Sequence, residues 1–428
     1  MNEGSGEMSI QTTESARSAF EKAVADYPDV PFHIILKLDL LRRGAYLTEE
    51  ALDAVQNDEY RFGPMRIFYS HGNTKGTDRE IPGSILLRDA TTASVSFDED
   101  YREPYRIERE NGAFALYDGD EFIDTIDFTP RPKYYGKKTS RGVPMESIAS
   151  ARAQRLIINT YKHCHLWDTG DQCRYCAFFT DLIRAKQAAQ EDRAAKEVDA
   201  EDIYETVREV LKEPGRISEI YLTGGMDYSG EVLFENEVNR YIRILQAIGR
   251  NFKGRFSSQI MAPAYSREQL RRIYQETGLT SYCPNVEVWD EEISKHICPG
   301  KNRWPGNTEW IRRTVDAVEI FGKGNVYTQV VAGVEMVQPY GFPTVEEALE
   351  SNFQACEFFA KHGVVFLSTV WHPHKHASLG EHPVPPLDYY VRLVRGLHEI
   401  RKSYGLTSDN DDYKHCGNHA DSDLERGD

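Results

Sequence analysis

The fold is decided by residues 155–176, which read RLIINTYKHCHLWDTGDQCRYC. Residues 155–160 form an apolar, β-branched run of the kind that buried strands contain. A polar loop follows and carries three cysteines, Cys164, Cys173 and Cys176, spaced C-x8-C-x2-C. The two-residue gap between the last two cysteines suits a tight turn, and thiolates this close in sequence are suited to binding metal. The stretch therefore predicts a strand that runs into a metal-binding loop.

From residue 152 onward, strand-like apolar runs alternate with longer amphipathic stretches. Six repeated βα units imply parallel strands joined by right-handed crossovers. Polar residues gather after the strands, at the end where barrel active sites are built, which favours a barrel over an open Rossmann sheet. We therefore expect an α/β fold with a partial (β/α)6 TIM-type barrel over residues 151–407. The strands are predicted at 155–160, 219–223, 255–261, 281–288, 326–334 and 364–370, and the helices at 201–212, 236–248, 267–276, 308–321, 344–362 and 387–404.

The rest of the chain has a different pattern. Residues 1–60 predict an N-terminal helical segment, and residues 61–130 predict a small antiparallel β domain. A Pro- and Gly-rich linker is expected at 131–150. Residues 408–428 form an acidic, His-containing segment with few apolar residues, and we expect a flexible tail or a lid there. The strands of the β domain are predicted at 65–69, 84–87, 93–97, 114–117 and 122–128.

Composition narrows the functional classes. A net charge of −17 and a pI near 5.3 disfavour nucleic acid as the partner, since gripping phosphate requires excess Lys and Arg. The apolar runs are too short to cross a bilayer, no signal pattern opens the chain, and seven cysteines without such a pattern suit a reducing compartment. We expect a cytoplasmic protein without membrane contact. The other cysteines are scattered and are expected to be small buried apolar residues: Cys283, Cys298, Cys356 and Cys416.

Two kinds of metal site fit the cysteine loop. Three thiolates could each bind one iron of a cubane, which leaves the fourth iron open to a small molecule. Alternatively, the three cysteines and one histidine could bind zinc in an enzyme or a binding protein, with His163, His165 or His415 as the fourth ligand. The zinc alternative is weakened because no second close pair of ligands lies nearby.

In this arrangement the chain resembles the radical SAM superfamily over roughly residues 155–370. Its enzymes carry a three-cysteine motif on the loop after the first barrel strand, with an aromatic residue before the last cysteine, a position that Tyr175 fills. The usual first gap is three residues, so the gap of eight is a departure. The resemblance implies an oxygen-sensitive enzyme with a 4Fe-4S cluster that reductively cleaves S-adenosylmethionine (SAM) to a 5′-deoxyadenosyl radical for hydrogen abstraction. It further implies a small-molecule substrate and an electron donor such as flavodoxin or ferredoxin.

The same resemblance suggests cofactor-binding residues at the ends of the later strands. Gly224, Gly225 and Asp227 stand where the family's motif contacts the SAM amino group, although two glycines ending a strand could be a plain turn. On the third strand, Ser258 or a neighbour is polar where apolar residues are expected. Asn285 and Glu287 share one face of the fourth strand and could bind the ribose or carboxylate, with Lys301 either neutralising a carboxylate there or lying on the surface. Gly333 and Val334 would lie beside adenine, whereas Glu335 could be a structural strand-end residue.

The catalytic residues and the reaction are not identified by any motif. The candidates are His372, His374 and Gln259. The two histidines belong to the run WHPHKH, which ends at His376 and follows the sixth predicted strand, so it could line the substrate pocket or be a solvated loop. Substrate contacts in such barrels come from variable loops, so the substrate itself is not predicted.

Overall fold

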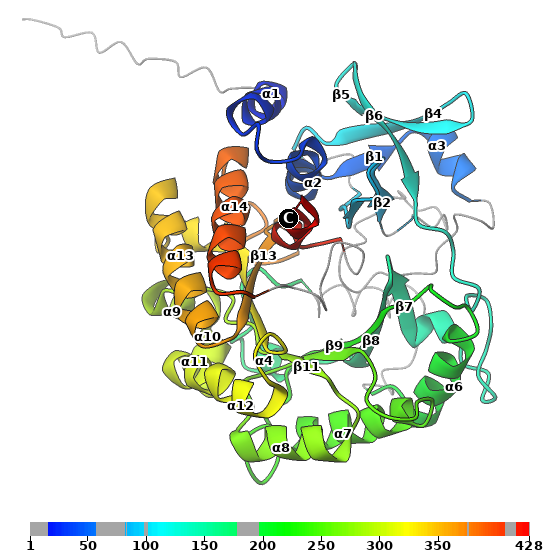
Figure 1. Cartoon of the computed structure of the whole chain (residues 1–428), viewed down its shortest axis with the longest axis vertical. Coiled ribbons are helices and arrows are strands. Elements are labelled where there is room, and N and C mark those ends of the chain that lie inside the picture. Colours follow the sequence, from blue (N-terminus) through cyan, green and yellow to red (C-terminus); the bar gives the residue numbers. More distant parts are fainter. Residues whose placement is uncertain are drawn as a thin grey trace, which may run out of the picture.

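The computed structural model describes residues 16–56, 82, 84–97, 102–177, 197–374, 376–406 and 417–427. Its larger part is a curved sheet of parallel strands wrapped by helices (Figure 1). In the described chain the sheet contains β8 (Arg155–Tyr161), β9 (Glu219–Gly224), β10 (Ser258–Met261), β11 (Ser281–Cys283), β12 (Tyr327–Ala332) and β13 (Val365–Val370). The short β7 (Ala149–Arg152) pairs antiparallel with β8 at the edge.

The six parallel strands follow one another in space as they do in sequence. Parallel ladders of hydrogen bonds pair β8 with β9, β9 with β10 and β10 with β11, and a separate ladder pairs β12 with β13. The bridges Tyr282–Val326 and Glu287–Val330 connect these two sheets, so the curved layer continues across them. This order confirms the predicted α/β fold with a partial barrel.

Alternation along the strands sets the two faces of the barrel wall. Leu156, Ile158, Ile220, Leu222 and Ile260 are buried in the main core, together with residues of the surrounding helices. Their neighbours in sequence therefore face the lumen. The outer helices are α6 (Ala200–Val210), α7 (Glu235–Gly249), α8 (Arg267–Glu276), α11 (Asn307–Asp316), α12 (Val318–Phe321), α13 (Val345–Lys361) and α14 (Leu387–Ser403).

The N-terminal part is a mixed unit of helices and strands. It contains α1 (Ala16–Asp26), α2 (Phe32–Arg43), β1 (Ala45–Leu47), α3 (Glu49–Ala54), β2 (Ile85–Leu86), β3 (Thr92–Ala93), β4 (Tyr105–Glu110), β5 (Ala113–Asp118) and β6 (Glu121–Phe128), with strand order β1-β4-β5-β6-β2-β3. Because β1 pairs in parallel with β4, the segment expected to be helical contributes a strand to the sheet. The strand predicted at 65–69 lies outside the described residues.

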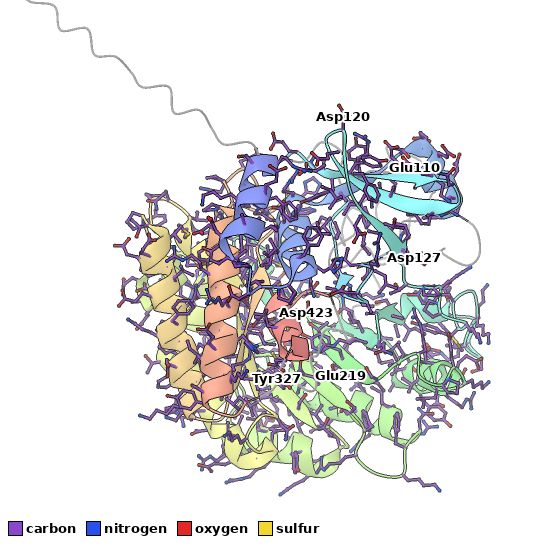
Figure 2. All side chains as sticks on the ribbon, turned by 45° about the horizontal axis from the view of Figure 1, so that its top comes forward. Glu110, Asp120, Asp127, Glu219, Tyr327 and Asp423 are labelled. Carbon is purple, nitrogen blue, oxygen red and sulfur yellow. The ribbon has the colours of Figure 1, made fainter. Side chains whose placement is uncertain are left out.

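Residues 417–427 are packed into the protein and do not form the flexible tail that was one of the two expectations for residues 408–428, while residues 408–416 lie outside the described residues. Residues 417–427 include α15 (Ala420–Asp423) and η4 (Leu424–Gly427), which pack against α2, α14 and β13. Asp421 pairs with Arg401 at 2.9 Å and Asp423 pairs with Lys37 at 2.6 Å, and all four side chains are fully buried. Figure 2 shows Asp423 in the middle of the molecule, whereas Asp120 projects from the outer end of the N-terminal sheet. Charge alone suggested exposure, but these aspartates are paired inside.

Candidate active site

The three cysteines lie on the loop that leaves strand β8. Cys164 precedes the short helix α4 (His165–Asp168), and Cys173 and Cys176 follow it after a turn. The N–H of Cys176 donates to the carbonyl of Cys173 at 3.0 Å, which closes the tight turn that the two-residue gap predicts. All three cysteines are half-buried residues. The eight-residue gap thus holds an ordered helical turn within the loop.

The end of strand β9 supports the loop from one side. The N–H of Gly225 donates to the carbonyl of Tyr161 at 2.9 Å, and the N–H of His165 donates to the carbonyl of Met226 at 2.9 Å. A Cβ atom on Gly225 would lie 1.9 Å from the carbonyl oxygen of His163 and 2.7 Å from Cβ of Cys164. Only glycine permits this approach, so Gly225 fixes the position of Cys164.

A second segment supports the loop from the other side. Helices α9 (Glu291–Ile297) and α10 (Pro299–Arg303) meet at Cys298. The N–H of Arg174 donates to the carbonyl of Ile297 at 2.9 Å, and that of Gly300 donates to Asp171 at 3.0 Å. Arg303 adds an ion pair with Asp171 at 2.5 Å. The loop is therefore held between the end of β9 and the α9–α10 junction.

The thiols differ in their readiness to ionise. Burial raises the pKa of Cys164 to about 11. A hydrogen bond from Cys298 lowers the pKa of Cys173, and this outweighs the opposing effect of burial. Cys298 itself is fully buried. The expectation that it is a small buried residue is confirmed, but its contact with Cys173 was not anticipated.

The placement of the thiols argues against a single zinc ion. Among the described residues, one group offers three possible metal-ligand atoms that lie within 4.8 Å of one another. It consists of His163, His165 and Asp168 and contains none of the cysteines. Three sulfurs on one zinc would stand roughly 3.8 Å apart, given Zn–S bonds of about 2.3 Å. His163 lies 2.9 Å from Asp168, and His165 lies 3.2 Å from Asp227. His415, the third suggested zinc ligand, lies outside the described residues.

Asp227 is bound within the protein. Its carboxylate accepts from Arg240 at 2.6 Å and from the N–H of Ser229 at 3.1 Å, and His165 lies beside it. Burial disfavours its ionised form, but the hydrogen bonds from Ser229 and Arg240 prevail and hold its pKa below the usual range. The predicted contact with the SAM amino group would have to displace these partners. Gly224 also lies close to the loop, because a Cβ atom on it would be 3.0 Å from the backbone nitrogen of Tyr161.

Asn285 and Glu287 lie together on the lumen side, as their spacing predicts. The ammonium of Lys301 lies 2.5 Å from a carboxylate oxygen of Glu287 and 2.9 Å from the carbonyl of Asn285. The Asn285 amide donates to the sulfur of Met261 at 3.1 Å. Of the two positions considered for Lys301, the structure shows the one beside the carboxylate: its side chain is half-buried and pairs with Glu287, because α10 carries it back toward the strand end.

The lumen contains polar side chains whose hydrogen bonds are not completed by the described residues. Gln259 is buried, and its amide nitrogen has no such partner. Asn159, on the neighbouring β8, is buried with neither side-chain atom paired. Ser258, in contrast, donates to the carbonyl of Phe256 at 2.8 Å, on the face opposite Gln259. Asn159 was not singled out from the sequence, although its two-residue alternation with Arg155 places both on the same face.

The base of the lumen is closed by a buried ion pair. Arg155 on β8 and Glu219 on β9 meet at 2.8 Å, and both side chains are almost fully buried. Glu219 lies well inside the barrel part in Figure 2. The polar lumen therefore opens toward the cysteine loop rather than toward the starts of the strands.

The turn after β12 has a structural role. Gly333 adopts φ +113°, and a Cβ there would lie 2.8 Å from the hydroxyl of Tyr390. Buried Glu335 accepts from the N–H of Gly333 at 2.7 Å and from Asn352 at 2.9 Å, so it is a structural strand-end residue. Val334 is buried in the apolar group that contacts Tyr175 and Cys173. The segment thus backs the cysteine loop.

The histidines after β13 are packed into the protein. His372 hydrogen-bonds to the backbone at Leu41 and Arg42, at the end of α2, and burial lowers its pKa to about 4. It lines a small cavity with Ser94 and Ser96. His374 is also buried, and its Nδ1 accepts from the N–H of His376 at 3.1 Å. The structure places His372 between the N-terminal part and the barrel, not in the lumen.

Residues 164–346 match the family model of the radical SAM superfamily. The match begins at Cys164 and spans the cysteine loop and strands β9 to β12, so this part of the chain is a radical SAM domain, which indicates an enzyme of the radical SAM class. SAM and an iron–sulfur cluster are the cofactors of that class, and its substrates include small molecules. No helix in the described part of the chain has the length and apolar character to cross a membrane.

Individual relatives are more distant. The chain is 23% identical over 320 residues to the bacteriochlorophyllide c C-7(1)-hydroxylase of Chlorobaculum limnaeum, covering 71% of this chain and 74% of that protein. Among solved structures, methylornithine synthase matches 60% of this chain and 70% of its own at a TM-score of 0.40 and 12% identity. A radical SAM methyltransferase from Sphaerobacter thermophilus matches 95% of this chain and 98% of its own, at a TM-score of 0.40 and 13% identity.

Proposed function

We propose that the chain holds a 4Fe-4S cluster through Cys164, Cys173 and Cys176 and uses it to cleave SAM reductively. The observation that carries this proposal is the placement of the three thiols. They lie together on the loop after the first barrel strand, where the family match begins. When bound, the cluster supplies the electron that splits the sulfonium of SAM and so yields a 5′-deoxyadenosyl radical for hydrogen abstraction.

The chain's own residues bind and orient these groups. Gly225 lets the end of β9 lie against Cys164, and Tyr175 packs behind Cys173. Glu287 and Asn285, braced by Lys301, are our candidates for hydrogen bonds to SAM, with Gly333 and Val334 beside its adenine. Asp227 orients His165 and the end of β9 and is a less direct participant than its sequence position suggests.

The substrate is proposed to enter the lumen above Gln259 and Asn159. Both side chains are buried with unpaired polar atoms, which favours a ligand that hydrogen-bonds without carrying a net charge. The buried Arg155–Glu219 pair closes the opposite end and helps to exclude water. Hydroxylation is the reaction named for the Chlorobaculum relative and is the first reaction to test.

The cellular setting follows from the chemistry. A reducing compartment preserves both the thiolates and the cluster, so we place the enzyme in the cytoplasm and expect oxygen sensitivity. Reduction of the cluster requires a low-potential donor such as flavodoxin or ferredoxin.

Metal analysis of anaerobically purified protein tests the cluster directly. We expect roughly four iron and four sulfide per chain in the wild type and loss of both in Cys173→Ala. Cys356→Ala is the matched control, because this cysteine is buried between α13 and α14, away from the loop. One zinc per chain, or a Cys173→Ala protein that keeps its iron, would overturn the proposal.

A further inference from the structure

We infer that His163, His165 and Asp168 form a second metal site, the histidine site, which binds a divalent transition-metal ion such as zinc. Each residue offers one ligand atom, and the three atoms lie within 4.8 Å of one another. The site shares no residue with the cysteine triad, so it stands whether or not the cysteines hold a cluster.

The backbone directs these side chains away from the sulfur of Cys164. Cys164 is extended, with φ −134° and ψ 117°, and side chains alternate across extended backbone. His163 and His165 therefore share the face opposite the thiol, and their ring centroids lie 5.4 Å apart. Asp168 follows His165 by three residues in α4, a spacing that places both on one face of the turn. An ion bound there would tie the end of β8 to α4.

The donor set and the distances suit a small ion. Nε2 of His163 and a carboxylate oxygen of Asp168 lie 2.9 Å apart. Two such ligands on a tetrahedral zinc, each at about 2.0–2.1 Å, stand roughly 3.3 Å apart. The Asp168 side chain is 53% exposed, so it has room for the small rotation that the ion requires. Two imidazoles and one carboxylate are a known ligand set for zinc and for iron(II).

A buried carboxylate orients one of the ligands. Nδ1 of His165 lies 3.2 Å from one oxygen of Asp227, whose other oxygen accepts from Arg240 at 2.6 Å. A carboxylate on one ring nitrogen fixes a metal-binding histidine and makes its other nitrogen a better ligand. That nitrogen, Nε2, lies 3.1 Å from the hydroxyl of Tyr161, a hydrogen bond that the ion would replace.

The histidine site also has access to water. Tyr161, His165 and Asp227 line a cavity of about 370 Å³ together with Arg240 and Arg243 of α7. Three protein ligands leave at least one coordination position on zinc for water or a small molecule. The ion can therefore enter and exchange through this cavity, on the side of His165 and Tyr161.

The test is zinc titration of the anaerobically reconstituted enzyme after removal of loose metal with a chelator. We expect one zinc per chain beside roughly four iron, because the cluster and the zinc occupy different ligands. The zinc K-edge absorption spectrum should show nitrogen and oxygen ligands at about 2.0–2.1 Å and no sulfur near 2.3 Å.

Two variants decide whether the named residues bind the zinc. Asp168→Asn keeps a hydrogen-bonding partner for His163 but removes the carboxylate, and Asp120→Asn removes a fully exposed carboxylate at the outer end of the N-terminal sheet (Figure 2). Loss of an outer partner costs about 10–100-fold in metal affinity, so loss of a ligand in Asp168→Asn should cost at least about 100-fold. Asp120→Asn should bind zinc as the wild type does, and both variants should keep wild-type iron.

The inference is overturned if zinc does not bind stoichiometrically, if both variants bind it equally tightly, or if sulfur appears among its ligands. The proposed function fails on a different observation. Zinc in place of the iron would contradict the cluster, whereas zinc that accompanies four iron in the wild type, and stays bound in Cys173→Ala, supports the histidine site.

Discussion

Gly225→Ala is expected to disrupt the cysteine loop. The new Cβ would lie 1.9 Å from the carbonyl oxygen and 2.5 Å from the carbonyl carbon of His163. A relaxed carbon–oxygen contact requires roughly 3.3 Å, so the loop must move by about 1.4 Å. Overpacking of this kind costs about 1–3 kcal/mol, and the obstacle here is backbone, which cannot rotate away. Because Cys164 follows His163 directly, its sulfur moves with the loop.

Two measurements on the reconstituted protein report this displacement. Iron per chain is expected to fall below half the wild-type value, and 5′-deoxyadenosine formation is expected to fall by about a hundredfold, since misplacement near 1 Å has effects of that size. Gly254→Ala is the matched control, because its Cβ would meet nothing within 4 Å. A Gly225→Ala protein with wild-type iron and activity would refute the claim that β9 fixes Cys164.

Further predictions concern the lumen, pH and the buried C-terminus. Gln259→Leu is expected to lower substrate-dependent 5′-deoxyadenosine formation about tenfold, while Ser258→Ala stays within about twofold, because only Gln259 faces the lumen; similar losses in both would contradict the assigned faces. Burial lowers the pKa of His372 to about 4, below its unfolded value, so its contribution to the free energy of unfolding is present above about pH 6.5 and is lost toward pH 4. The free energy of unfolding, measured with urea at pH 7.5 and at pH 4.5, should differ less between the two pH values in His372→Asn than in the wild type, by up to about 3 kcal/mol. The same difference in both proteins would show that burial does not lower the pKa of His372. Asp421→Ala leaves Arg401 buried without its partner and should cost about 3–5 kcal/mol, whereas Asp316→Ala, which removes a partner of largely exposed Arg312, should cost about 1 kcal/mol or less, both measured by urea unfolding. Equal effects would mean that residues 417–427 do not pack as described.

Local pattern predicted the barrel well because its strands are short apolar runs that alternate with amphipathic helices. Strands at 155–160, 219–223 and 364–370 correspond closely to β8, β9 and β13. Where tertiary pairing overrides local pattern, the sequence was less informative. Strand β4 reads YRIERE, and its charges hid a strand that pairs with both β1 and β5.

The candidate site shows the same division. The loop position, the tight turn before Cys176 and the shared face of Asn285 and Glu287 follow from local spacing. The contacts of Cys298 and Lys301 depend on how α9 and α10 return to the cysteine loop, and no spacing rule connects residues that far apart. The histidines after β13 and Asp227 were assigned by position alone, whereas their actual partners are set by packing.

The most direct test of the central claim is SAM cleavage by the anaerobically reconstituted enzyme with dithionite, followed by chromatographic quantification of 5′-deoxyadenosine and methionine. We predict that the wild type forms both products in equal amounts and that single Ala variants of Cys164, Cys173 and Cys176 form neither, while Cys356→Ala behaves as the wild type. A reconstituted wild type that contains the cluster but leaves SAM intact, or a cysteine variant of the loop that still cleaves it, would contradict the account.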